Sequence, residues 1–164
     1  MIIETERLQL IPLLPQQLRA WIEERPALER ELNMTYQAEP LEGIFLEIVK
    51  GQLAVTEAHP EDYLWHSFWL IVRKSDRVVV GSADFKDVPD TQQEVEIGYG
   101  LGQAFEHQGY MTEAVQAMCD WALAQENVAH ILAETDVDGW ASQRILKRCG
   151  FQEEKRGETV WWKL

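Results

Sequence analysis

The chain of 164 residues suits one domain with one sizeable hydrophobic core, and we expect residues 1–164 to form a single domain. Its 28 acidic residues outnumber the 15 basic residues and give a formal net charge of −13, which argues against nucleic acid or an anionic membrane as a partner. No basic-then-apolar signal segment opens the chain and no apolar run has the length that crosses a bilayer, so we expect a cytoplasmic protein.

The first third of the chain predicts one strand followed by helices. Residues 2–11 alternate in polarity, which is typical of a half-buried strand. Pro15 begins a short amphipathic helix that Pro26 interrupts. A second helical region carries its apolar side on residues 41–49 and is expected to end before Pro60.

The middle of the chain predicts a succession of strands. Residues 68–73 and 77–85 form a hairpin around a turn at Lys74-Ser75-Asp76. A turn at Pro89-Asp90 then leads into residues 94–99, which alternate polar and apolar side chains.

The last third alternates helix and strand. Apolar residues recur at steps of three and four over 111–122, which predicts a helix. A buried strand is expected at 131–135, a helix that a glycine ends at 140–149, and a final hairpin at 151–155 and 159–163. Strands flanked by helices in this order predict a mixed α/β sheet rather than a doubly wound one.

Cysteine and histidine are sparse in this sequence. Cys119 falls inside a predicted helix and Cys149 at the end of another, so we expect two packing residues in a reducing compartment rather than a disulfide. The four histidines show no metal-ligand spacing with one another or with the cysteines, so we expect no bound metal.

The junction between the strand at 94–99 and the helix at 111–122 carries the first functional signal. The connection from Gly100 to Gln108 is roughly nine residues long, against ~2–6 for most strand-to-helix links. Gly109 follows, and free backbone N–H groups at the start of a helix, together with its dipole, favour a phosphate or diphosphate. The connection contains no Lys or Arg, so an anion would be held by backbone amides. The alternative is an ordinary junction that binds nothing.

This junction is part of a longer pattern that three segments of the chain form. The segments are Glu96-Ile97-Gly98-Tyr99, then Gln108 to Ala114, then Ala141-Ser142 with Arg144 to Phe151. In order and spacing they resemble the acetyl-CoA-binding region of the GCN5-related N-acetyltransferase (GNAT) superfamily. Residues 4–10 are also similar to the first strand of the branch that includes the ribosomal-protein N-terminal-alanine acetyltransferases.

The resemblance implies a fold and an activity. The fold would be a central mixed, mostly antiparallel twisted sheet of about seven strands with helices on both faces. The activity would be transfer of an acetyl group from acetyl-CoA to a primary amine, either a protein N-terminus or a small amine, by direct attack on the thioester. No Ser-His-Asp pattern suggests a covalent intermediate. Acetyl-CoA and the amine would be the partners of a monomer or a homodimer.

The resemblance also implies which residues hold acetyl-CoA. Its diphosphate would bind the backbone amides of His107, Gln108, Gly109, Tyr110, Met111 and Thr112. Its pantetheine arm would lie along Tyr99, Gly100 and Leu101. Ser142 and the family's asparagine position, here Gly139, would contact the same arm, although a serine at a helix start is equally suited to capping.

Besides Gly139, three positions depart from the family pattern. Glu106 replaces a usual Gln or Arg, His107 replaces a usual glycine, and Leu146 stands where many members have the tyrosine that protonates the leaving thiolate. The alternative function is therefore a non-catalytic acyl-CoA-binding or interaction module that retains the fold.

Acetyl transfer to an amine also requires a group that removes the proton of the amine. Glu96 is our candidate, because it lies opposite Val95 and Ile97 on the strand expected to carry the cofactor. The alternatives are a plain solvent-facing carboxylate at this position, or a base role for water or for Glu94, Asp84 or Glu134.

The acceptor is expected to enter between residues 15–57 and the hairpin tip at 156–158. The N-terminal helical region is rich in carboxylates, and a few of them are candidates to attract a cationic acceptor. Four tryptophans either line the acceptor pocket or pack in the core, and these are Trp65, Trp69, Trp161 and Trp162.

Overall fold

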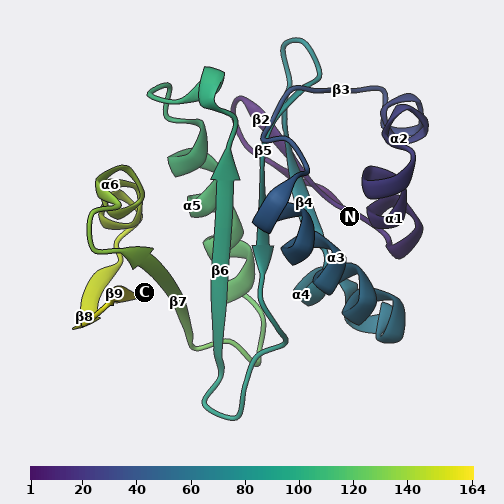
Figure 1. Ribbon diagram of the computed structural model, residues 1–164. Helices are drawn as coiled ribbons and strands as arrows, with labels where there is room; N and C mark the ends of the chain where they lie inside the picture. The colour runs from purple at the N-terminus through teal and green to yellow at the C-terminus, as the bar shows by residue number, and fades with distance from the viewer.

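A nine-stranded sheet forms the centre of the computed structural model, which describes all 164 residues (Figure 1). The strands run β1-β2-β4-β5-β6-β7-β9-β8 across the sheet, and the short β3 pairs with β5. All neighbours on this path are antiparallel except β6 and β7. The strand bounds are β1 Ile3–Glu4, β2 Leu8–Pro12, β3 Thr35–Tyr36, β4 Phe68–Arg73, β5 Val78–Phe85, β6 Glu94–Leu101, β7 His130–Asp136, β8 Gln152–Arg156 and β9 Thr159–Lys163.

Helices cover both faces of the sheet. Their bounds are α1 Pro15–Glu23, α2 Arg25–Leu32, α3 Gly43–Ala58, α4 Tyr63–His66, α5 Tyr110–Leu123 and α6 Trp140–Arg148, with 3-10 turns at 60–62 and 103–105. None of these helices combines the length and the apolarity that crossing a bilayer requires. No group of three or more His, Cys, Asp or Glu side chains is arranged to hold a metal ion.

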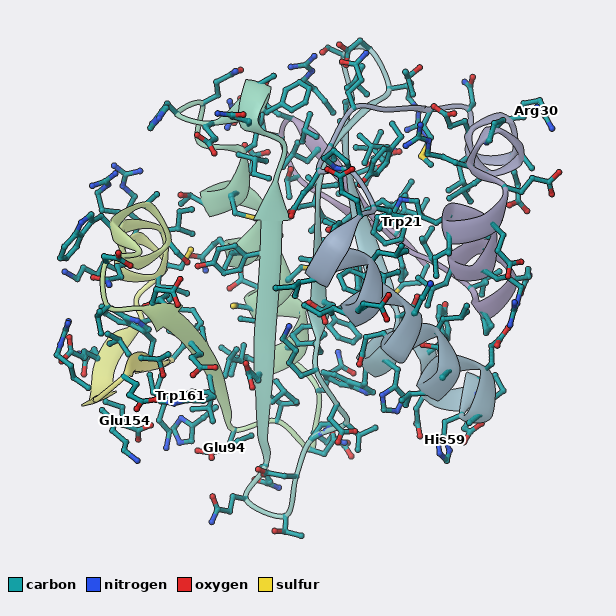
Figure 2. All side chains as sticks on the ribbon, viewed as in Figure 1. Trp21, Arg30, His59, Glu94, Glu154 and Trp161 are labelled. Atoms are coloured by element: carbon teal, nitrogen blue, oxygen red, sulfur yellow. The ribbon has the colours of Figure 1, made fainter.

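Two hydrophobic clusters lie on the two faces of the sheet. Because side chains alternate along a strand, Trp69 and Ile71 of β4 join the cluster under α5, whereas Leu70 and Val72 join the cluster under α1 to α3. Trp21 of α1 fills the centre of the second cluster, between the sheet and the N-terminal helices (Figure 2). The sheet therefore lies between two hydrophobic layers, and a different set of helices covers each layer.

The sequence-based prediction of fold class is confirmed: the sheet is mixed, mostly antiparallel and covered on both faces. The strands at 68–73 and 159–163 are found with the expected bounds, and the other α-helices and strands after residue 76 differ by one or two residues at either end. Nine strands are present rather than about seven, because β1 and β3 were not expected as separate strands.

The prediction of one strand over residues 2–11 is wrong. Residues 3–12 form the β1–β2 hairpin, in which Ile3 lies opposite Leu10. Glu113 of α5 stabilises the turn: its carboxylate accepts hydrogen bonds from the Thr5 hydroxyl at 2.5 Å, the Arg7 N–H at 2.9 Å and the Arg7 Nε at 2.7 Å. Local alternation of polarity cannot reveal a turn that is stabilised by a residue more than a hundred positions away.

Candidate active site

The parallel strands β6 and β7 separate after a short paired segment. They pair from Glu94 opposite His130 to Glu96 opposite Leu132, and no pairing continues beyond that point. Figure 1 shows β7 bending away from β6, with α6 beyond it. The remaining half of β6, which ends at Leu101, therefore has an open edge on this side.

The hydrogen-bond register of β6 determines which backbone groups face this opening. The N–H of Lys86 donates to the carbonyl of Glu96, and the N–H of Gly102 donates to the carbonyl of Val80. Backbone groups of an antiparallel strand alternate between its two edges, so those of Tyr99 and Leu101 point away from β5. They offer an extended ligand the same pairing that an added strand would make.

The loop that leads into α5 presents a row of free backbone donors. No backbone N–H from His107 to Thr112 donates a hydrogen bond to another group of the protein. The first helical bond of α5 runs from the N–H of Glu113 to the carbonyl of Gly109. These amides and the positive end of the helix dipole suit a diphosphate.

Two residues of this loop adopt left-handed backbone conformations. Gly109, which precedes α5, has φ of +80°, and His107 has φ of +64°. Only glycine adopts this region without a steric penalty, which explains why glycine is the usual residue at both positions in the GNAT pattern. His107 therefore keeps the loop conformation at a cost of about 1–2 kcal/mol.

Arg7 holds the loop before α5 in place through contacts with Gln108 and Tyr110. Its Nη1 donates to the carbonyl of Gln108 at 2.9 Å, and its guanidinium lies 4.5 Å from the centre of the Tyr110 ring. The same side chain pairs with Glu113 at 2.7 Å. Burial alone would raise the pKa of Glu113, but hydrogen bonds from Thr5 and Arg7 outweigh it and leave that pKa lowered. The β1–β2 turn thus fixes the start of α5 and the loop together.

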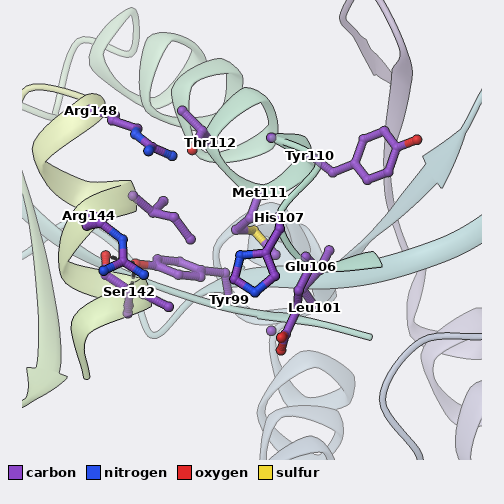
Figure 3. A pocket seen from close by; sticks show the side chains of 14 residues that line it. Tyr99, Leu101, Glu106, His107, Tyr110, Met111, Thr112, Ser142, Arg144 and Arg148 are labelled. Atoms are coloured by element: carbon purple, nitrogen blue, oxygen red, sulfur yellow. Dashed lines mark hydrogen bonds between the residues drawn. The ribbon is translucent and has the colours of Figure 1, made fainter. Parts of the chain in front are cut away.

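A cavity of about 410 Å³ lies between the free amides, the open edge of β6 and helix α6 (Figure 3). Most residues that the sequence assigned to the cofactor line it: Tyr99, Gly100, Leu101, His107, Gly109, Tyr110, Met111, Thr112 and Ser142. Gln108 and Gly139 do not. The Gln108 side chain turns back to the Ala104 carbonyl, and Gly139 borders a separate hollow beyond Ser142. The structure therefore brings together residues from β6, the loop, α5 and α6.

Two cations in the cavity were missed from the sequence. Arg144 and Arg148 extend from α6 into the cavity, and neither forms an ion pair (Figure 3). Their spacing of four residues places them on one face of the helix. Gln143 and Leu146, which are buried, fix the opposite face of α6 against the fold. The loop lacks basic residues, but the helix across the cavity supplies two charges for an anion.

Tyr99 crosses from β6 to α6 inside the site. Its hydroxyl lies 2.6 Å from the Ser142 hydroxyl and 3.3 Å from the Ser142 carbonyl. Burial raises the pKa of Tyr99 to about 12, so the phenol keeps its proton at neutral pH. Tyr99 and Ser142 border both the 410 Å³ cavity and a second hollow on the other face of the sheet. This hydroxyl pair thus marks the point where the two spaces meet.

The second hollow contains Glu96. It is lined by Lys86, Glu96 and Glu134 together with Gly98, Tyr99 and Ser142. Burial raises the pKa of Glu96, Lys86 opposes this effect, and Glu134 and Asp84 add to it. A half-buried carboxylate with a raised pKa has the properties of a general base, and it lies beside the Tyr99–Ser142 pair.

The three rival carboxylates lie in different surroundings. Glu94 forms an ion pair of 2.7 Å with Lys163 at the far end of β6, near the β8–β9 hairpin (Figure 2). Glu134 accepts a hydrogen bond of 2.6 Å from the Thr159 hydroxyl. Asp84 of β5 is buried, and burial raises its pKa, with Lys86 opposing that effect. Of the rivals, only Asp84 has a buried oxygen without a hydrogen-bond partner.

The tryptophans mostly pack in the core. Trp69 and Trp162 are fully buried, and Trp65 stacks on Phe85 and Trp121. Trp161 of β9 is partly buried. None of the four borders the hollows described above, so packing accounts for them.

An acetyltransferase family model matches most of the length of the chain. Residues 7–152 match the family model described as the acetyltransferase (GNAT) domain. Over 95 residues the chain is 36% identical to an uncharacterized N-acetyltransferase, YjdG, of Bacillus subtilis (strain 168), an alignment that covers 57% of this chain and 56% of that protein. The chain thus spans about half the length of the curated relatives it matches.

Solved structures show the same fold at low sequence identity. The ribosomal-protein-S5-alanine acetyltransferase from Vibrio fischeri has a TM-score of 0.72 at 17% identity, covering 100% of this chain and 96% of that chain. A ribosomal L7/L12 α-N-protein acetyltransferase in complex with coenzyme A has a TM-score of 0.70 at 17% identity, covering 100% and 97%. This chain therefore folds as those proteins do.

Proposed function

Because this chain belongs to the GNAT acetyltransferase family, we propose that it transfers an acetyl group from acetyl-CoA to a primary amine, which attacks the thioester directly. The expected membership of the superfamily is confirmed, and the fold matches members of its ribosomal-protein branch. The acceptor is a protein N-terminus or a small amine.

The observation that carries this proposal is the row of free backbone N–H groups from His107 to Thr112. The first N–H groups of a helix have no partner within it, and a row of such groups along a cavity suits an anionic ligand. The neighbouring Arg144 and Arg148 add positive charge to the same cavity. Acetyl-CoA has several phosphate charges that these groups would bind.

The open edge of β6 fits the rest of the cofactor. The N–H and C=O groups of Tyr99 and Leu101 would pair with the amides of the pantetheine arm, which leads from the diphosphate toward the Tyr99–Ser142 pair. Acetyl-CoA supplies an activated acetyl thioester at this point. The residues around it bind the arm, exclude water and direct a proton to and from the reacting groups.

Glu96 and Tyr99, which lie where the two cavities meet, would transfer the protons of the reaction. Glu96 accepts the proton of the incoming ammonium and leaves a neutral amine that can attack. The Tyr99 phenol, hydrogen-bonded to Ser142, donates a proton to the departing sulfur. Tyr99 and Ser142 would thus supply the proton for the leaving thiolate, which Leu146 cannot supply because leucine has no ionisable group.

Release of free CoA thiol in the presence of a panel of primary amines tests the proposal. We expect amine-dependent release with one acetylated amine formed for each CoA. The Gly109→Asp variant should lose acetyl-CoA binding, because a side chain is strained at φ of +80° and its Cβ would lie 3.3 Å from Arg7 Nη2, which would displace the loop amides expected to hold the diphosphate. Gly157→Asp is the matched control, since that glycine lies in the open tip of the last hairpin and should bind acetyl-CoA as the wild type does.

The alternative, a binding module without activity, predicts a different outcome. Such a protein would bind acetyl-CoA in calorimetry and release no CoA with any amine. If the folded wild-type protein does not bind acetyl-CoA at all, both the enzyme and the module are excluded.

A further inference from the structure

A hollow on the α3 face of the sheet lies across β6 from the proposed acetyl-CoA cavity. It has a volume of about 300 Å³ and is bordered by Asp84, Lys86, Glu39 and the apolar side of α3. The register places Asp84 opposite Gly98, and Lys86 opposite Glu96. These groups therefore share one face of two neighbouring strands.

Two glycines of β6 leave space for charged groups above the strand. A Cβ at Gly98 would lie 2.7 Å from Lys86 Nζ and 2.9 Å from Asp84 Oδ1. A Cβ at Gly100 would lie 2.7 Å from Glu39 Oε1. Any larger residue at either position would displace these groups, so the glycines allow a charged cluster to lie directly on the backbone.

Asp84 is the unexplained member of this cluster. Only 2% of it is exposed, and its Oδ2 has no hydrogen-bond partner. The closest cation, Lys86 Nζ, stands 3.7 Å from Oδ1, which exceeds hydrogen-bond length. A buried carboxylate oxygen without a hydrogen-bond partner costs free energy, so Oδ2 is open to a donor that the protein does not supply.

The cluster also has an apolar neighbour. Ile44 and Ile48 of α3 border the same hollow and remain 81% and 43% exposed. Phe45 lies between them and borders the hollow as well. An apolar wall beside a carboxylate matches a molecule that carries a positive charge at the end of an alkyl arm.

We propose that Asp84 is the anchor for the ammonium group of the acceptor, and that Lys86 is a tethered ammonium that occupies this place until a primary alkylammonium displaces it. The inference rests on the proposed acetyl transfer and names its acceptor class. The alkyl arm lies along Ile44, Phe45 and Ile48, and the ammonium lies over Gly98, within reach of Glu96. Lys86 has an exposed path to leave, since 41% of its side chain is accessible.

This arrangement assigns opposite effects to the two charged residues. Asp84 attracts the acceptor, so Asp84→Asn should raise the KM for n-butylamine by at least tenfold. Lys86 competes with the acceptor, so Lys86→Met should lower that KM several-fold. The KM for acetyl-CoA should change in neither variant, because the cofactor cavity lies on the other side of β6.

Direct binding separates this inference from the proposed function. The probes are n-butylammonium and its uncharged counterpart 1-butanol, titrated into the wild type, the two variants and Gly98→Ala, with the thermal midpoint Tm as the folding control. We expect n-butylammonium to bind more tightly to Lys86→Met and more weakly to Asp84→Asn and Gly98→Ala, and 1-butanol to bind none of them measurably.

Each outcome decides one question. If n-butylammonium binds in this pattern but no CoA is released, the acceptor site stands and the proposed activity fails. If amines are acetylated while Asp84→Asn and Lys86→Met shift the KM in the same direction, or leave it unchanged, the activity stands and the ammonium site is wrong. If Asp84→Asn does not fold, the other two variants test the site: n-butylammonium should bind more tightly to Lys86→Met and more weakly to Gly98→Ala. Equal affinities in these two variants would contradict the ammonium site.

Discussion

Glu96 is the residue whose role can be tested most simply. It lies half-buried beside the Tyr99–Ser142 pair, and burial raises its pKa. Glu96→Gln should lower kcat by about 10²–10⁴-fold, the usual cost of losing a general base, and leave the Kd for acetyl-CoA unchanged. Because its pKa is raised, kcat/KM of the wild type should increase with pH through a value above the ordinary ~4.3 of a glutamate.

Glu94→Gln is the matched control for that change. Glu94 is on the same strand but pairs with Lys163, away from both cavities. Its variant should keep kcat close to that of the wild type. A Glu96→Gln enzyme with undiminished kcat would transfer the base role to Asp84, Glu134 or water.

Arg144 and Arg148 provide a second test at the scale of single residues. Replacing either by Gln removes a charge from the acetyl-CoA cavity and should raise the Kd for acetyl-CoA by about tenfold, corresponding to ~1.4 kcal/mol. Calorimetry measures this directly. Arg30→Gln removes an exposed charge from α2 instead and should leave the Kd unchanged. Equal Kd values for all three variants would show that α6 does not contact the phosphates.

Among single residues, the sequence predicted the cavity-lining positions that belong to a short motif. Tyr99, Gly109 and Ser142 belong to short motifs, and each of them borders the cavity. Arg144 and Arg148 were missed because the rotation of α6 is set by the packing of Leu146, which no short motif encodes. Asp84 and Glu39 were not recognised as one cluster because they come together only when the loop between β3 and α3 places Glu39 over Gly100 of β6.

At the scale of elements, the β1–β2 turn supports the loop before α5. Glu113 accepts hydrogen bonds from Thr5 and Arg7, and Arg7 also holds the carbonyl of Gln108. Glu113→Gln removes the charge at the centre of this contact and should lower stability by ~1–3 kcal/mol. It should also raise the Kd for acetyl-CoA, because the free amides would no longer be held in one arrangement.

The pH dependence of that effect has a definite sign. The folded-state pKa of Glu113 is lowered, so its contribution to stability is present above the unfolded-state pKa of about 4.3 and is lost as the pH falls through the folded-state value. The wild type should therefore have a higher Tm than Glu113→Gln at pH 7, and the difference should shrink below pH ~4. A difference in Tm that stays constant down to pH ~3 would contradict the assigned role of the carboxylate.

Elements with strong periodicity were predicted well, and short ones were not. β4 and β9 match the expected ranges, because the continuous apolar run of β4 and the alternating burial of β9 are local properties of the sequence. β1, β3 and the short α4 contain too few residues to show a period. The hairpin of β1 and β2 depends on Glu113, so its turn is a property of the tertiary structure rather than of the local sequence.

At the scale of the whole molecule, the net charge of −13 has a measurable consequence. The proposed acceptor is a cation that enters a hollow bordered by Asp84 and Glu39, while Glu96 lines the other hollow that Lys86 borders, so attraction to the protein should assist its binding. The Debye length falls from about 10 Å at 0.1 M salt to about 3 Å at 1 M. The KM for n-butylamine should therefore rise with salt while kcat stays level. A KM that does not depend on salt would leave shape and apolar contact to set acceptor choice.

In the proposed reaction acetyl-CoA lies along the open edge of β6, and the acceptor approaches from the other face of the sheet. A crystal structure of the protein with coenzyme A and n-butylamine measures both directly. We predict the diphosphate within hydrogen-bond distance of the amides from His107 to Thr112, the sulfur next to the Tyr99–Ser142 pair, and the amine over Gly98 beside Asp84. A cofactor bound elsewhere, or an amine on the same side of β6 as the pantetheine arm, would contradict the account.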